Sequence, residues 1–256
     1  VGPISIASVE DGVTGSTNRH LSCSWLIYPP APALFIDWRN TMARSLRFTA
    51  FEFDPIKYDA MLSDVSNLDN DTLSAISGLS SVRAVRTMEN RMMVMSIYDS
   101  IEELDAAADA HRSIFAGIGQ YMTGQPLVRS GEIVGVADGK TPVSNIGFMR
   151  FVRVCFDDSK WDAIKSYMDS DLQPIFGDVP GFTAIRAARL REGSSEGKPA
   201  MLVAAAYENE ASAQAAMATA QKALGGVAEY MTEEPLIRQG DLVWQFRTSE
   251  DIRLRG

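Results

Sequence analysis

An internal repeat constrains the fold of this chain more than any other feature of its sequence. Residues 121–134 (YMTGQPLVRSGEIV) align without gaps with residues 230–243 (YMTEEPLIRQGDLV), and eight of the fourteen positions are identical. The same offset of 109 pairs Tyr98 with Tyr207, and an offset of 103 pairs Arg47-Phe48 with Arg150-Phe151. Such self-similarity indicates one structural unit present twice. We therefore interpret the body of the chain as two copies, about 47–137 and 150–248.

Each copy shows the same order of predicted elements: strand, helix, strand, strand, helix, strand. In the first copy, runs rich in β-branched and aromatic residues predict strands, and a 3.6-residue apolar periodicity predicts helices. The strands are 47–53, 82–88, 92–98 and 127–134, with helices from Pro55 and along 101–122. In the second copy the strands are 151–156, 182–190, 200–206 and 236–246, with helices from Asp158 and along 210–230.

This βαββαβ order predicts a ferredoxin-like unit, an antiparallel four-stranded sheet with both helices on one face. The other face of the sheet then has to be buried as well, because Phe151, Val152, Val154 and Phe156 place apolar side chains on both faces of one strand. Two units packed sheet to sheet bury these faces mutually. We predict an α+β fold in which two tandem ferredoxin-like units form an intramolecular dimeric α+β barrel.

The first 41 residues do not share this pattern. They contain four prolines and three glycines and no sustained periodicity, and they lack the features of a signal peptide. Met42 directly precedes the first predicted strand, so we interpret 1–41 as an unstructured leader or an over-extended reading frame. A genuine targeting or docking arm is the alternative. The predicted divisions are 1–41, the first repeat 42–142 and the second repeat 143–256.

Charge and composition exclude several classes of function. The net charge is -9 and the pI is near 4.8, whereas nucleic acids and anionic membranes attract basic surfaces. Only Cys23, Cys155, His20 and His111 supply thiol or imidazole groups, which is too few for a Cys/His metal cage or a disulfide framework. We expect a cytoplasmic protein without a nucleic-acid or membrane partner, a pseudo-dimer within one chain that is able to self-associate further.

Two segments carry a resemblance to a known family. The second copy contains Val179-Pro-Gly-Phe182, then Ala184-Ile-Arg186, and later the stretch from Leu202 through Tyr207 to Ala211. In the first copy, the segment from Ile97 through Tyr98 to Glu103 corresponds to the stretch around Tyr207. This pattern resembles the antibiotic-biosynthesis-monooxygenase-like proteins of the dimeric α+β barrel superfamily, in tandem-repeat form. The resemblance covers both repeats and marks a fold more than a reaction.

What the resemblance implies about cofactors depends on the branch of the superfamily. Chlorite-dismutase-like members hold haem through a histidine in the second unit, but here no histidine follows His111. Haem-degrading members pair a helix histidine with an Asn on the first strand and a Trp near the end of the third. This chain has no Asn in 47–53 and has Tyr98 at the Trp position. We therefore expect no cofactor and no metal.

His111 is the first candidate site residue, because it lies on the apolar stripe of its predicted helix while the matching position in the second copy is Ala220. An imidazole in a cavity between helix and sheet is suited to accept a phenolic proton. Tyr98 is a candidate hydrogen-bond donor and Arg86 a candidate anion clamp. Each residue also has a competing structural interpretation. His111 would be an ordinary core histidine, Tyr98 a scaffold residue that the second copy repeats as Tyr207, and Arg86 an arginine that braces the interface between the repeats.

The leading functional hypothesis is a cofactor-free monooxygenase that acts on a quinol or aromatic molecule, with His111 as base, Tyr98 as donor and Arg86 binding the anion. Such chemistry needs a base, a donor for the developing oxyanion and a dry pocket. The alternative is a non-catalytic ligand-binding, structural or stress-response barrel. An enzyme should have a pocket with His111 or Tyr98 on its wall, whereas a structural barrel should fill that space with side chains.

Overall fold

A computed structural model describes residues 44–193 and 197–248. The predicted leader 1–41, which contains His20 and Cys23, lies outside the described residues, and so does Met42. The predicted boundary between the repeats, 142/143, falls in the connection between the fourth and fifth strands, which contains the short 3-10 helix Val143–Asn145.

The first half of the barrel contains four strands and four α-helices. After β1, the 3-10 turn Pro55–Lys57 leads into α1. The Asp54 side chain caps the start of this turn by accepting a hydrogen bond from the Ile56 N–H. The elements in order are β1 (Ser45–Glu52), α1 (Tyr58–Ser66), α2 (Asn70–Ser74), β2 (Leu79–Met88), β3 (Arg91–Tyr98), α3 (Ile101–Ala106), α4 (Ala108–Ile118) and β4 (Leu127–Asp138).

The second half repeats this order with one helix fewer before its second strand. Asp157 caps the turn that precedes α5, as Asp54 does before α1. The elements are β5 (Phe148–Cys155), α5 (Trp161–Phe176), β6 (Phe182–Leu190), β7 (Ala200–Tyr207), α6 (Glu210–Ala215), α7 (Met217–Gly225) and β8 (Leu236–Arg247).

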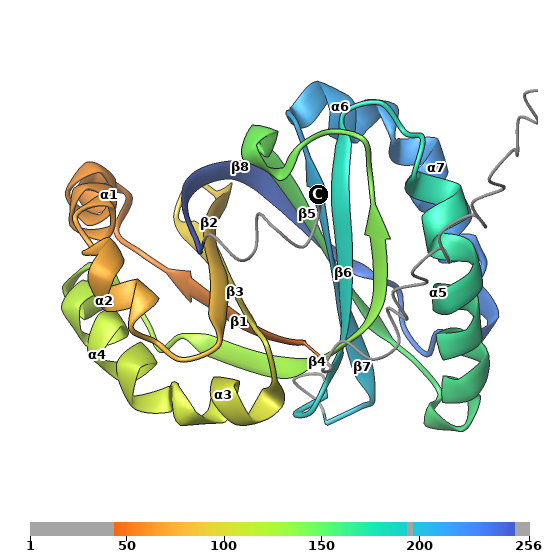
Figure 1. Cartoon of the computed structure of the whole chain (residues 1–256), viewed down its shortest axis with the longest axis horizontal. Helices are drawn as coiled ribbons and strands as arrows, with labels where there is room; N and C mark the ends of the chain where they lie inside the picture. Colours follow the sequence, from red (N-terminus) through yellow and green to blue (C-terminus); the bar gives the residue numbers. More distant parts are fainter. Residues whose placement is uncertain (1–43, 194–196, 249–256) are drawn as a thin grey trace, which may run out of the picture. The chain divides into compact units, whose positions relative to one another are not determined.

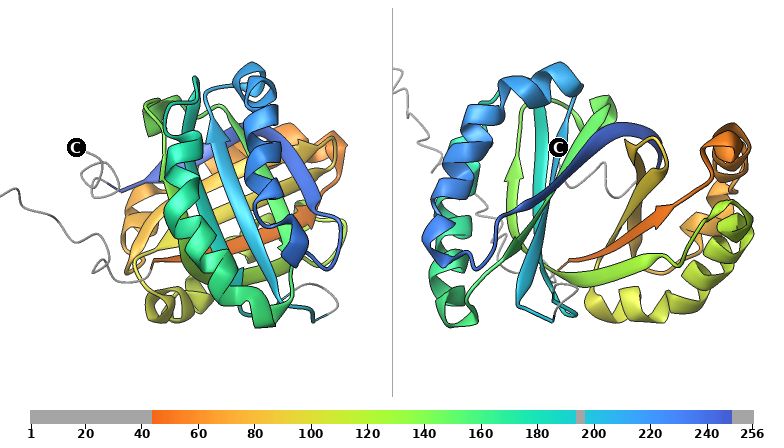
Figure 2. Two further views of the ribbon diagram at one scale, coloured as in Figure 1. Left: turned by 90° about the vertical axis from the view of Figure 1, so that its right-hand side faces the viewer. Right: turned by 180° about the vertical axis from the view of Figure 1, so that it is seen from behind.

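The eight strands form one closed antiparallel barrel in the order β1-β3-β2-β8-β5-β7-β6-β4 (Figures 1 and 2). Strands β4, β1, β3 and β2 are contiguous, as are β8, β5, β7 and β6. The β2–β8 and β4–β6 pairings join these two sets and leave no open sheet edge. The prediction of an α+β barrel is therefore confirmed.

Alternate side chains along the strands fill the barrel interior. Leu46 and Phe48 of β1 pack in one buried cluster with Met149 and Phe151 of β5. The rings of Phe48 and Phe151 meet edge to face with centroids 6.0 Å apart. Cys155 is 2% exposed and lies in the same cluster. Both halves thus contribute to a single interior core.

The helices cover the outside of the barrel, with α1–α4 over the first set of strands and α5–α7 over the second (Figure 1). The long helices predicted for 101–122 and 210–230 are each broken, at Ala107 and at Ala216, which are both nearly fully buried. Both predictions were wrong in this respect. At each break the backbone leaves the helical range, with ψ near 0°, so the second segment begins in a new direction.

The strand predictions agree closely with the structure, and the 182–190 strand has the observed bounds. Helix α2 was not predicted, because its five residues are too few to show a period. None of the helices in the described ranges combines the length and the apolar character needed to cross a membrane.

Candidate active site between α4 and the sheet

Tyr98 and His111 meet in the buried space between the sheet and α4. Tyr98 ends β3, on the same helix-facing side of the strand as Ser96, and His111 lies in the first turns of α4. The phenol oxygen of Tyr98 is hydrogen-bonded to Nε2 of His111, and the ring centroids are 5.7 Å apart. Tyr98 is 0% and His111 5% exposed. The break at Ala107 starts α4 four residues before His111 and so helps to position the imidazole.

The burial of this pair favours its neutral form. Burial, assisted by the charge of Arg47, lowers the pKa of His111 to about 4. Burial also raises the pKa of the Tyr98 phenol, and Arg47 offsets part of that rise. Nε2 is the only hydrogen-bond partner of the Tyr98 hydroxyl among the described residues. With both groups neutral, the phenol is the stronger donor and the imidazole nitrogen the stronger acceptor, so we assign the hydroxyl as the donor to Nε2 and place the imidazole proton on Nδ1.

Arg47 supplies a positive charge beside the pair. It lies on β1, where it pairs with Ser96 of β3 on one side and Ser130 of β4 on the other. Burial lowers the pKa of its guanidinium, and Tyr98 and Glu192 offset part of that effect. Its Nε is buried without a hydrogen-bond acceptor in the described part of the chain. A cation in this position stabilises an anion bound next to the Tyr98–His111 pair.

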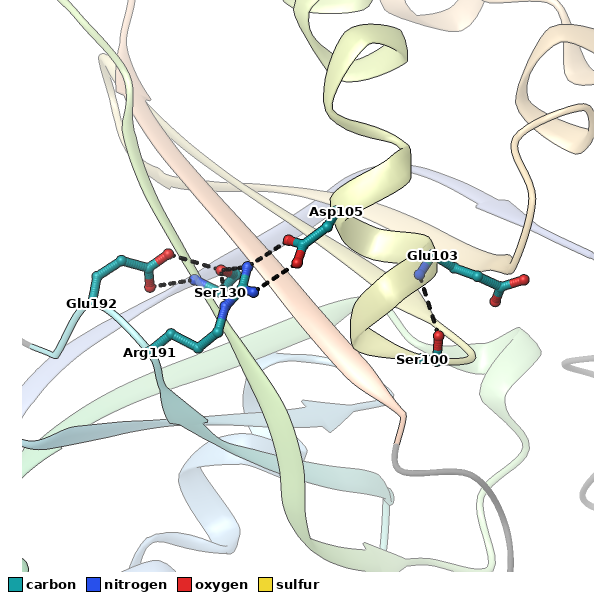
Figure 3. A network of polar contacts seen from close by, with 6 residues as sticks. All are labelled: Ser100, Glu103, Asp105, Ser130, Arg191 and Glu192. Carbon is teal, nitrogen blue, oxygen red and sulfur yellow. Dashed lines mark hydrogen bonds and ion pairs between the residues drawn. The ribbon is translucent and has the colours of Figure 1, made fainter.

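A polar network joins the two halves at Ser130 (Figure 3), the β4 residue that pairs with Arg47, and its Glu192 carboxylate interacts electrostatically with Arg47. The Glu192 carboxylate, just after β6, accepts hydrogen bonds from the Ser130 N–H (2.9 Å) and hydroxyl (2.8 Å). The neighbouring Arg191 makes a two-pronged ion pair with Asp105 of α3, at 2.7 and 2.9 Å. The second half thus anchors α3 and β4, the elements that flank the site in the first half.

A cavity of about 60 Å³ lies between the sheet and α1, α2 and α4. Its wall is apolar apart from His111 and Ser96, and it includes Met61, Met92 and Trp244. It is smaller than the roughly 150 Å³ cavities known to accept benzene. An aromatic ligand would therefore have to displace side chains, and flexible methionines are suited to that.

The structure places Arg86 away from the Tyr98–His111 pair. Arg86 pairs with Met92 of β3, six residues from Tyr98, which is roughly 20 Å along a strand. Its guanidinium stacks 4.0 Å from the Tyr58 ring centroid and donates to the Glu89 carbonyl (2.7 Å). Arg47 occupies the place beside the pair instead. The match of Arg47 with Arg150 in the repeat is a sequence signal, but Arg86 has the same signal in its match with Arg186.

The pH dependence of stability should report the buried imidazole. An unfolded histidine binds a proton near pH 6.5, whereas His111 in the folded protein resists protonation until about pH 4. In that window the unfolded chain binds more protons, so stability falls as the pH falls, by on the order of 3 kcal/mol for this group.

We expect the free energy of unfolding of wild type to decline relative to that of His111→Gln between pH 7 and pH 4. Urea titrations at each pH measure the free energy of unfolding of both proteins. The difference between the two values cancels the contribution of the carboxylates, which both proteins contain. Parallel curves would contradict the assignment.

Comparisons with known proteins identify the fold. No protein-family model and no curated protein matches the sequence. A "putative monooxygenase" from Lactobacillus acidophilus NCFM superposes with a TM-score of 0.64 at 8% identity, covering 80% of this chain and 96% of its own. One from Fusobacterium nucleatum has a TM-score of 0.65 at 12% identity, covering 81% and 95%. An "anthrone oxidase-like protein" has a TM-score of 0.57 at 14% identity, covering 82% and 95%.

These similarities cover nearly the whole of each solved structure and most of this chain. The chain therefore has the dimeric α+β barrel fold that the sequence motifs indicated. At these identities the comparison establishes the fold and leaves the chemistry to be argued from the residues of the site.

Proposed function

We propose that the protein binds a compact quinol or related aromatic molecule in the cavity beside His111 and oxygenates it without a cofactor. The proposal rests on one observation above all: the histidine of a buried, neutral His–Tyr pair lines an apolar cavity in the first half, while the second half has alanine at the histidine position. The names of the structural neighbours support the same class of chemistry.

In this proposal His111 is the base, because it is the only histidine among the described residues and its imidazole is neutral at pH 7. The substrate proton moves to Nε2, and the Tyr98 hydroxyl turns from Nε2 to the substrate oxygen. The low pKa of the free imidazole rises once an anion lies beside it, because the anion counters both desolvation and the Arg47 charge. Arg47, rather than Arg86, stabilises that anion.

The overall reaction converts an activated methylene to a carbonyl: R₂CH₂ + O₂ gives R₂C=O + H₂O. The substrate carbanion donates an electron pair to O₂ and forms a carbon–oxygen bond, and the proton held by His111 completes a hydroperoxide. Loss of water then breaks the O–O bond and the remaining C–H bond. The apolar wall of the cavity keeps bulk water from the carbanion.

We also infer that each half is a ferredoxin-like unit and that the barrel is a tandem-repeat counterpart of a two-chain dimer. In support, the strand orders β4-β1-β3-β2 and β8-β5-β7-β6 are equivalent. The strand register is equivalent as well: Ser45 of β1 pairs with Tyr98 of β3, and their repeat partners Phe148 of β5 and Tyr207 of β7 pair in the same way.

A non-catalytic ligand-binding barrel is the second candidate. Two observations favour it: the cavity is small, and a cavity of similar size, about 70 Å³, lies in the second half without a histidine. A protein of this kind would bind an apolar molecule without changing it.

Oxygen uptake separates the two functions. Purified protein, treated with a chelator and assayed with a panel of quinols and of phenols carrying a benzylic methylene, is expected to consume one O₂ per carbonyl formed, faster than autoxidation in buffer. Binding of these compounds without any uptake would support the ligand-binding barrel and contradict the oxygenase.

A further inference from the structure

The second half contains a cavity of its own, bounded by α5, α7 and the strands β5, β6 and β7. Its volume is about 70 Å³, and its wall is apolar except at one end. At that end lie Arg150 and Tyr207, the repeat partners of Arg47 and Tyr98. Both side chains are deeply buried, with 3% and 0% exposure.

Arg150 is only partly satisfied by the protein. Its Nε donates to Gln239 Oε1 (2.8 Å), and one terminal nitrogen, Nη2, donates to the Ala213 carbonyl (3.2 Å). The other, Nη1, is buried without an acceptor in hydrogen-bond geometry among the described residues, and the Tyr207 hydroxyl also has no partner in that geometry. Burial raises the pKa of the Tyr207 phenol, and the neighbouring Arg150 guanidinium offsets part of that rise. No carboxylate in the described ranges forms an ion pair with Arg150.

The difference between the halves explains why these donors remain available. In the first half His111 accepts the hydrogen bond of Tyr98. At the equivalent position the second half has Ala220, which lines the cavity and offers no acceptor. The guanidinium carbon of Arg150 lies 5.8 Å from the Tyr207 ring centroid, so the charge and the phenol are at the same end of the cavity.

A buried guanidinium without an anion is costly, and a buried donor without an acceptor adds to the cost. We propose that the second cavity binds a small apolar carboxylate, whose carboxylate accepts hydrogen bonds from Arg150 Nη1 and the Tyr207 hydroxyl while its apolar body fills the space under α7. Arginine and a hydroxyl are well suited to a carboxylate.

The helix above the cavity limits the size of the ligand. Helix α7 has no fully buried residue, and its side chains facing the cavity include Ala220 and Ala223, which are partly exposed. This thin cover offers a route for exchange. At about 70 Å³ the cavity is smaller than those that accept benzene, so a ligand the size of benzoate has to displace side chains, and the flexible Met168 and Met201 on the wall are suited to that. The site is separate from the one beside His111 and does not depend on oxygenation.

Calorimetric titration of the full chain with benzoate and with benzamide tests the proposal, since the two probes have the same shape and differ in charge. Benzoate is expected to bind more tightly than benzamide. Arg150→Met should weaken benzoate binding by about 10- to 100-fold, because a charge-assisted hydrogen bond is lost. Arg189→Met, the same substitution on β6 outside the cavity, should leave binding unchanged.

Two further variants keep the test decisive if Arg150→Met does not fold. Tyr207→Phe removes a hydroxyl that has no partner in hydrogen-bond geometry among the described residues, so it should fold normally and bind benzoate less tightly. Ala220→Leu fills the cavity and should abolish binding. Equal affinities for benzoate and benzamide, or unchanged benzoate binding in Tyr207→Phe and Ala220→Leu, would overturn the proposal.

Discussion

We expect Phe151→Ala to lower the free energy of unfolding by about 3–5 kcal/mol, the range for removing a large aromatic side chain from a core. Phe151 is 1% exposed and packs edge to face on Phe48 from the other half of the barrel. The cavity left behind cannot close easily, because each strand around it is hydrogen-bonded on both sides. The loss should therefore lie toward the upper part of this range.

Urea denaturation followed by circular dichroism measures this loss, with Phe151→Leu expected to fall between wild type and alanine. Ile56→Ala serves as the control, because Ile56 is 94% exposed and its truncation should change stability by less than about 0.5 kcal/mol. Since one interior cluster contains residues of both halves, wild type should unfold in a single transition. A loss below about 1 kcal/mol for Phe151→Ala would contradict a shared, rigid interior.

The second large effect concerns the proposed oxygenation. We expect His111→Ala to lower the rate of oxygen consumption by about 10²- to 10⁴-fold, the usual contribution of a positioned base. The substitution gives the first half the residue that the second half has at this position, Ala220. Tyr98→Phe should reduce the rate less, because it removes a donor while the imidazole remains.

The pH profile distinguishes a base from a residue that only shapes the cavity. With a His111 pKa of about 4 in the free protein, the wild-type kcat/KM should be constant from neutral pH to about pH 5 and fall below that. Ile114→Ala, on the same cavity wall, is the matched control and should alter KM while keeping the profile. A His111→Ala enzyme that retains the wild-type rate and profile would remove His111 from the mechanism.

Much of the fold was predictable because its signals are local. Alternating apolar residues identified all eight strands to within a few residues, and the 109-residue offset related one half to the other. The helix breaks at Ala107 and Ala216 were not predictable, because the apolar period continues through both positions. A change in the direction of a helix depends on the surface beneath it, which no local pattern describes.

The site was predictable only in part for a similar reason. His111 and Tyr98 were identified from a helix stripe and a strand end, and the structure brings them into contact. Arg86 and Arg47 both follow strand patterns shared between the repeats, so sequence alone had no means to choose between them. The choice follows from register: Arg47 lies opposite Ser96, and Arg86 lies opposite Met92 at the other end of β3.

The sequence by itself determined the two-copy organisation, the order of elements in each copy and the need to bury both faces of the sheet, because periodicity and self-similarity can be read from the order of the residues alone. Tertiary structure alone decided which arginine faces the Tyr98–His111 pair, that Glu192 of the second half lies near it, and that Arg150 and Tyr207 share an end of a second cavity. Those relations join residues distant in the chain. They arise only when strand register and barrel closure set the distances between side chains.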